Sequence, residues 1–155
     1  MRLSLIVTGN RPERWVSEGC NEFLKRIPAP YAPEIIELPP SRKHAQNPQL
    51  ALAEEARQII RAVRPGARLV VLDERGKAWS TRDLAERWQQ WQHQGQDVAL
   101  VIGGASGCAE QLKADAEVLW SLSALTLPHM IVRLMVIEQL YRAWSLLTGH
   151  PYHRD

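Results

Sequence analysis

The sequence predicts an α/β fold, a mostly parallel β-sheet with helices on both faces. Residues 69–72 and 98–102 are apolar at every position, which is typical of strands covered on both faces. Strand-like and helix-like segments alternate along the chain, and such alternation favours crossover connections between parallel strands. The 155 residues, 45% apolar and 23% charged, suit a single domain over residues 1–155.

The first half of the chain contains two predicted strands and two predicted helices. Residues 2–8 have a strand pattern, and residues 11–13 interrupt it before an apolar helical stripe formed by Val16, Cys20, Phe23, Leu24 and Ile27. A second short strand is expected at residues 34–38 and a helix at residues 49–63. Because Cys20 lies on the apolar stripe, we expect it in the core rather than as a nucleophile.

The second half contains two further predicted helices. Ser80 and Asp83 have the spacing of a capping box for a helix that ends near Gly95. The last helix is expected at about residues 130–147, with Pro128 in its first turn and Thr126 as its cap. This helix is apolar around most of its circumference, so we expect it to pack on two sides.

Composition excludes several classes of protein. No apolar run approaches the ~18 residues of a membrane span, and the first eight residues lack the features of a secretory signal, so a cytoplasmic location is expected. Cys20 and Cys108 have no neighbours at metal-ligand spacing, which argues against a zinc site or a disulfide framework. The net charge of +2 permits a polyanionic partner without requiring one.

Two loops are candidate binding segments. The glycine-rich residues 103–107 follow the strand at 98–102, where ligands of open α/β sheets usually bind, but their spacing fits neither a dinucleotide motif nor a P-loop. This segment forms either a binding loop or a tight turn. Residues 120–129 are rich in small and hydroxyl side chains, and they form either a ligand-binding backbone or a capped helix start.

The last helix and the tail carry charged and ring side chains. Glu138, Arg142 and Ser145 share a narrow polar strip, which either faces a second subunit or holds an intrahelical ion pair. The tail, residues 150–155 (HPYHRD), combines groups that stack on RNA bases and bind phosphate, although a solvated tail is the alternative. The basic loop at residues 42–44 is a further candidate for phosphate contacts or simply solvated surface.

Four segments together resemble the ribosomal RNA large subunit methyltransferase H family of the SPOUT superfamily. They are residues 102–107 (IGGASG), 120–129 (WSLSALTLPH), 138–145 (EQLYRAWS) and 150–154 (HPYHR). The likeness extends over essentially the whole chain, including the strand end at Leu72 and a turn at Gly76 and Lys77. One departure is visible, because Ala105 and Ser106 stand where other members of the family have Pro and Glu.

The resemblance implies a minimal SPOUT methyltransferase, an α/β fold with a deep C-terminal trefoil knot, acting as a homodimer. Periodicity does not reveal the knot, and general topology rules argue against one. The implied activity is methylation of N3 of a pseudouridine in 23S rRNA on the assembled ribosome, with S-adenosyl-L-methionine as the cofactor. No metal, membrane or DNA partner is implied. The cofactor-binding positions are expected at Leu72, Gly103, Gly104, Leu122, Ser123, Ala124, Leu125, Thr126 and Leu127.

Methylation at N3 requires that its proton leaves. We expect the catalytic residues among His153, Arg154, Tyr152, Arg142, Glu138 and His129. His153 is the first candidate for the base and His129 the second, while Arg154, Arg142 or Arg133 would stabilise charge on the uracil oxygens. Tyr152 would help to hold the base.

The tail begins just after the helix expected at the dimer contact, so we expect it to complete the active site of the opposite subunit. Two alternatives stay open. One is a ribosome-binding module without catalysis, and the other is a nucleotide-binding hydrolase that uses Gly103 and Gly104, for which phosphate-loop spacing is missing.

Overall fold

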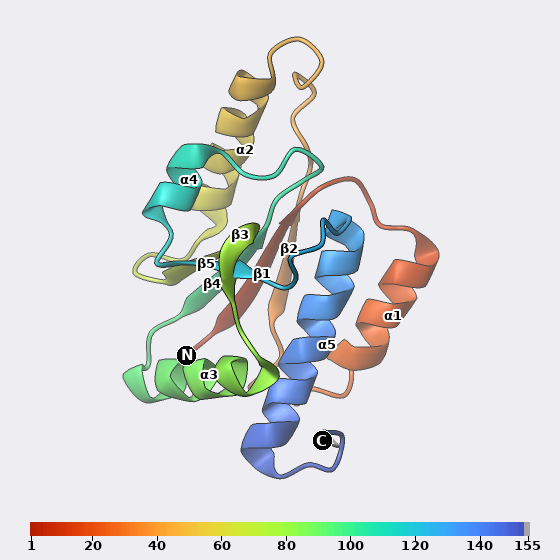
Figure 1. Cartoon of the computed structure of the whole chain (residues 1–155), viewed down its shortest axis with the longest axis vertical. Helices are drawn as coiled ribbons and strands as arrows, with labels where there is room; N and C mark the ends of the chain where they lie inside the picture. The colour runs from red at the N-terminus through yellow and green to blue at the C-terminus, as the bar shows by residue number, and fades with distance from the viewer. Residues whose placement is uncertain (154–155) are drawn as a thin grey trace.

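The computed structural model describes residues 1–153 and confirms the predicted α/β architecture (Figure 1). Within these residues, five parallel strands form one sheet in the order β2-β1-β4-β3-β5. The strands are β1 (Leu3–Thr8), β2 (Glu34–Leu38), β3 (Arg68–Ala78), β4 (Val98–Ile102) and β5 (Val118–Ser121). The helices are α1 (Arg14–Leu24), α2 (Pro48–Ala62), α3 (Thr81–Gln94), α4 (Glu110–Asp115) and α5 (His129–Thr148).

Helices cover both faces of the sheet, as the sequence predicts. In β1 and β4, alternate side chains enter two separate clusters: Leu5 and Leu100 pack with residues of α1, α3 and α5, whereas Ile6 and Val101 pack with residues of α2 and α4. Figure 1 shows these two sets of helices on opposite sides of the sheet. Since β1 and β4 are central and every residue of each is buried, neither face can be left to solvent.

β3 is longer than the sequence predicts, because it does not end at Leu72 but continues to Ala78. Both Leu72 and Lys77 pair with Trp120 of β5, so residues 73–76 bulge out of the ladder. A Cβ on Gly76 would lie 2.5 Å from the carbonyl carbon and oxygen of Leu119, so only glycine allows this close approach. The expected turn at Gly76 and Lys77 is therefore wrong, and a bulge within a strand takes its place.

The ends of α3 agree with the prediction, whereas the start of α5 differs from it. Ser80 and Asp83 form the predicted capping box, and Gly95 ends α3 in the left-handed conformation at φ 68°. α5 begins at His129 with Pro128 as its N-cap, and no side chain caps it. Thr126 is not the cap, because the helix begins two residues later than a Thr126 cap requires. The Thr126 hydroxyl instead donates to the Glu74 carboxylate at 2.8 Å.

Two elements have no counterpart in the prediction. The short helix α4 and the strand β5 occupy residues 110–121, and Trp120 and Ser121 belong to β5 rather than to a loop. β5 ends in a serine and only two of its four residues are buried, and α4 has fewer than two turns, so neither has a clear hydrophobic pattern in the sequence. No helix among residues 1–153 has the length and hydrophobicity of a membrane span.

Shortening a central side chain tests the importance of the two-sided core. Leu100 is fully buried in β4, so we expect Leu100→Ala to lower the free energy of unfolding by about 2–5 kcal/mol. Ile60→Ala on α2 is the control, because Ile60 is 49% exposed and should cost less than about 1 kcal/mol. Urea unfolding measures both changes, and equal effects would contradict the assigned core.

Candidate functional site

A cavity of about 790 Å³ lies beside the bulge of β3, where β4 and β5 end and α5 begins. This is the size of a site for a nucleoside-sized ligand, and the carboxyl edge of a parallel sheet is where such sites form. Eight of the nine predicted cofactor-binding residues line it, and the exposed Ala124 is the one that does not. The eight are Leu72, Gly103, Gly104, Leu122, Ser123, Leu125, Thr126 and Leu127.

The glycine loop is a tight turn and a wall of the cavity at the same time. The Gly107 N–H donates to the Gly104 carbonyl at 2.9 Å, and Gly107 has φ 77°. A Cβ on Gly103 would lie 2.6 Å from the Gly107 carbonyl oxygen and 2.8 Å from Cys108 Sγ. The segment is therefore both the tight turn and a part of the cavity lining that the sequence left as alternatives, and only glycine at position 103 allows its close packing. Ala105 and Ser106 lie on its rim.

The bulge of β3 adds charged groups that the sequence analysis missed. Asp73, Glu74 and Arg75 line the cavity. Asp73 lies 2.9 Å from the Lys113 ammonium and accepts the Arg75 N–H at 2.8 Å. Burial would raise the pKa of Asp73, but the Arg75 N–H and the Lys113 ammonium outweigh it and hold the pKa below its usual value. The sequence does contain a signal that could have found them, because the three charged residues directly follow an apolar strand.

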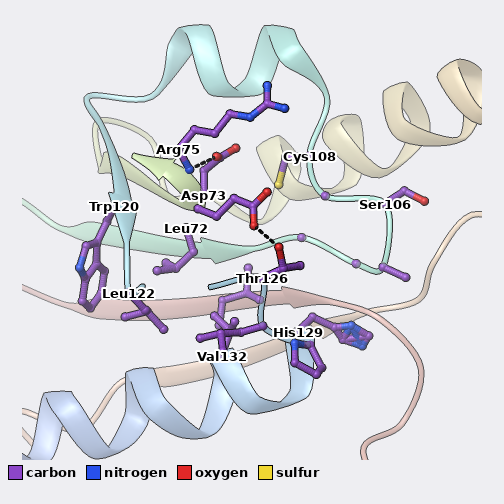
Figure 2. A pocket seen from close by; sticks show the side chains of 18 of the residues that line it. Leu72, Asp73, Arg75, Ser106, Cys108, Trp120, Leu122, Thr126, His129 and Val132 are labelled. Carbon is purple, nitrogen blue, oxygen red and sulfur yellow. Dashed lines mark hydrogen bonds between the residues drawn. The ribbon is translucent and has the colours of Figure 1, made fainter. Parts of the chain in front are cut away.

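Glu74 and Thr126 join the two sides of the cavity. The Thr126 hydroxyl donates to Glu74 at 2.8 Å, and Figure 2 shows this bond between the bulge of β3 and the segment before α5. The leucine side chains at 72, 122 and 127 and Val132 supply apolar surface around it. The cavity lining therefore combines apolar side chains, the backbone of the glycine loop and one carboxylate that accepts a hydrogen bond from a neutral hydroxyl.

His129 stands at the start of α5 and lines the same cavity. Burial lowers the pKa of His129, and the nearby Arg133 guanidinium lowers it further, so the ring is neutral at pH 7. Arg133 is only 7% exposed and lies 3.3 Å from the Glu37 carboxylate. Arg133 is therefore placed to pair with Glu37 rather than to contact a substrate.

Four of the other predicted catalytic residues meet at the opposite end of α5. Arg142 forms the ion pair with Glu138, at 2.7 Å, and the Tyr152 hydroxyl donates to the same carboxylate at 3.0 Å. The Arg142 guanidinium lies 4.8 Å from the centre of the Tyr152 ring, which also packs against Tyr141. These contacts anchor the start of the tail on α5.

His153 has a defined hydrogen-bond partner. Its Nδ1 lies 3.1 Å from the Ser145 hydroxyl oxygen, while that hydroxyl donates to the Arg142 carbonyl at 2.6 Å. Because Ser145 has a single hydroxyl proton, Nδ1 of a neutral His153 must be the donor, which leaves Nε2 with a free lone pair. His153 is thus oriented as a proton acceptor. Arg154 lies outside the described residues.

The two groups of candidate residues are not brought together within one chain. Ser145 follows His129 by sixteen positions along α5, which corresponds to about 24 Å along a helix. The start of α5, which lines the cavity, and the tail after its end are therefore far apart, as the course of the helix in Figure 1 shows. A reaction that uses both needs a second chain to supply one of them.

The remaining candidates are less available than the sequence indicates. In the basic loop, Lys43 lies 2.6 Å from Glu54 and His44 lies 2.8 Å from Glu55, so within residues 1–153 Arg42 is the exposed cation of this loop that forms no ion pair. Cys20 is buried in the core as predicted, and burial raises its pKa. Burial also raises the pKa of Cys108, in the cavity wall, to about 11. Within residues 1–153, no three His, Cys, Asp or Glu side chains are grouped to hold a metal.

Comparisons with known proteins give a consistent result. The family described as a predicted SPOUT methyltransferase matches residues 1–153. Proteins named ribosomal RNA large subunit methyltransferase H are 43% identical in Hahella chejuensis, covering 100% of both chains, and 46% identical in Dechloromonas aromatica, covering 100% of this chain and 99% of the relative. The structure of a probable methylase family protein from Haemophilus influenzae is similar in fold, with a TM-score of 0.55 and 14% identity over 99% of this chain and 71% of that one.

The state of His129 can be tested by NMR titration of its ring. We expect its pKa below 6.5, because burial and the Arg133 charge both disfavour the imidazolium. Arg133→Gln removes the smaller of the two causes, so the pKa should rise but stay below 6.5. Protonation should also cost stability as the pH falls below 6.5, since the unfolded chain then binds more protons. A pKa at or above 6.5 in the unchanged protein would contradict the assigned environment.

Proposed function

The chain belongs to the SPOUT methyltransferase family and to its ribosomal RNA large subunit methyltransferase H members, and on this premise we propose that it methylates N3 of a pseudouridine in 23S rRNA on the assembled ribosome. The proposed cofactor is S-adenosyl-L-methionine, and the proposed enzyme is a cytoplasmic homodimer with a trefoil knot. The observation that carries the proposal is the glycine-walled cavity that unites the predicted cofactor-binding residues.

The residues of the cavity fit this cofactor. S-adenosyl-L-methionine has no pyrophosphate, so the absence of a P-loop or dinucleotide motif from the sequence is consistent with it. The missing Cβ at Gly103 lets the glycine loop pack closely against residues 107 and 108 in the cavity wall, and Leu72, Leu122 and Leu127 offer apolar surface for adenine. The three charged residues of the β3 bulge add polar contacts at the same edge.

The bound cofactor supplies an electrophilic methyl group on a sulfonium. The protein must orient N3 in line with that methyl group and accept the proton that N3 loses. Nε2 of His153 is the group we assign to this proton, because Ser145 holds the ring in the tautomer that leaves Nε2 free. Tyr152 positions the tail by its bond to Glu138, and Arg154 is the candidate cation for charge on the uracil oxygens.

A second copy of the chain is part of the proposal, because the cavity and His153 lie at opposite ends of α5. The helix offers apolar surface for such a contact, with Met135 exposed and Leu134, Leu146 and Leu147 half-buried. If the partner packs on α5 in a symmetric pair, its tail can approach the cavity of the first chain. This arrangement places the neutral His129 beside the cofactor and His153 beside the base.

The decisive experiment is transfer of labelled methyl to ribosomes whose 23S rRNA carries the unmethylated pseudouridine. We expect label at N3 of that nucleotide with the unchanged protein. Gly103→Ala should weaken cofactor binding by calorimetry more than tenfold, because its Cβ would displace the Gly107 carbonyl and Cys108 from the cavity wall.

Ile60→Ala on α2 is the control, since Ile60 is 49% exposed and does not line the cavity. It should bind the cofactor within about threefold of the unchanged protein. Cofactor binding without any transfer to ribosomes would instead support a ribosome-binding module, and failure to bind the cofactor would overturn the proposal.

Mixed dimers test the shared active site. His153→Ala chains and Gly103→Ala chains should each be inactive alone, while a mixture that exchanges subunits should recover roughly a quarter of the unchanged activity, because half of the dimers then hold one intact site. Circular dichroism confirms that both variants are folded. No recovery in demonstrated mixed dimers would contradict a site built from two chains.

A further inference from the structure

The charges around the cavity are unequal. Three carboxylates line it, at Asp73, Glu74 and Glu110, against two permanent cations, at Arg75 and Lys113. His129 adds no charge at pH 7, because burial and Arg133 lower its pKa. The lining therefore carries one uncompensated negative charge, and the pairing of its members shows where that charge lies.

Glu74 is the carboxylate without a cationic partner among the described residues of this lining. The Lys113 ammonium pairs with Asp73 at 2.9 Å and with Glu110 at 3.3 Å. The Arg75 side chain extends away from Thr126 and His129, as Figure 2 shows. Glu74 instead accepts a hydrogen bond from the neutral Thr126 hydroxyl.

The position of Glu74 relative to the cofactor-binding stretch is also defined. Thr126 belongs to the stretch 122–127, and the 2.8 Å bond to it holds the exposed Glu74 carboxylate beside that stretch in the cavity lining. The close packing of Gly76 on β5 restrains the bulge that carries Glu74. A net charge held in this way acts on any charged ligand that enters.

We propose that Glu74 makes the cavity select the cationic methyl donor over the neutral thioether product, so that Glu74 is a specificity-determining residue. The inference rests on the proposed function and adds a role for a residue outside the predicted cofactor-binding set. S-adenosyl-L-methionine carries a sulfonium and an ammonium against one carboxylate, whereas S-adenosyl-L-homocysteine has lost the sulfonium charge. The two ligands otherwise share their adenosine and amino-acid groups, so the charge is the feature that distinguishes them.

The size of the effect follows from partial solvation. An attraction between unit charges several Å apart that solvent screens as strongly as bulk water does corresponds to about a three- to tenfold change in affinity. Because Glu74 is exposed, this preference should also decrease as salt is added. Product that binds less tightly than substrate would leave the cavity readily after each turnover.

Calorimetry with the full-length chain and each ligand separately is the test. Glu74→Gln keeps the shape and an oxygen acceptor for Thr126 but removes the charge. We expect it to weaken S-adenosyl-L-methionine binding by about three- to tenfold and to change S-adenosyl-L-homocysteine binding by less than about twofold. The ratio of the two dissociation constants is the quantity compared, and it needs no turnover.

Two further variants separate charge from structure. Thr126→Ser keeps both the hydroxyl that donates to Glu74 and the Glu74 charge but removes a methyl group from the cavity lining, so the ratio should stay unchanged even if both ligands bind less tightly. Glu110→Gln removes a carboxylate whose side chain is 90% exposed and already near Lys113, so the ratio should change by less than about twofold.

The outcomes are distinct. An unchanged ratio of the two dissociation constants in Glu74→Gln would overturn the inference. If both ligands also bound less tightly by the same factor, Glu74 would be a purely structural residue. If the unchanged protein binds neither ligand, the proposed function itself fails. A ratio that changes only in Glu74→Gln and decreases with salt in the unchanged protein supports charge selection by Glu74.

Discussion

The central pair of strands, β1 and β4, constrains the rest of the structure. Every residue of both strands is buried, and alternate side chains enter separate clusters on the two faces. Helices must therefore cover both sides, and all crossovers between these parallel strands return to the same edge. The carboxyl ends of the strands collect the glycine loop, the β3 bulge and the start of α5 there, which is why the cavity forms at that edge.

The length of α5 decides how the proposed reaction can be organised. Its first turn carries His129 at the cavity, and its last turns hold Tyr152 and His153 through Glu138 and Ser145. A rigid helix keeps these ends apart, so the tail of one chain cannot serve its own cavity without leaving these contacts. The proposed dimer would bring the two parts together without moving either, and the half-buried apolar residues of α5 are the surface expected for it.

Charge in the cavity is arranged by the bulge of β3. The bulge exists because Gly76 allows the strand to approach Leu119 closely and then resume pairing with β5. It presents Asp73 to Lys113 and Glu74 to Thr126, so one carboxylate is neutralised and the other is not. Gly76, which allows the close packing of β3 on β5, and Asp73 and Glu74, which set the charge of the cavity, thus lie within four consecutive residues.

Local patterns were sufficient to predict much of the chain. The buried strands, the capping box of α3, the burial of Cys20 and the family all follow from residues close together in sequence, because periodicity and capping act over a few residues. The cofactor-binding stretch came from the resemblance, and the structure places all of it except Ala124 around one cavity. Sequence alone could not assign Thr126 to Glu74, 52 residues away, or place Arg133 beside Glu37. Those contacts, and the bulge that replaces the expected turn, depend on which distant segments pack together, and only the tertiary structure decides that.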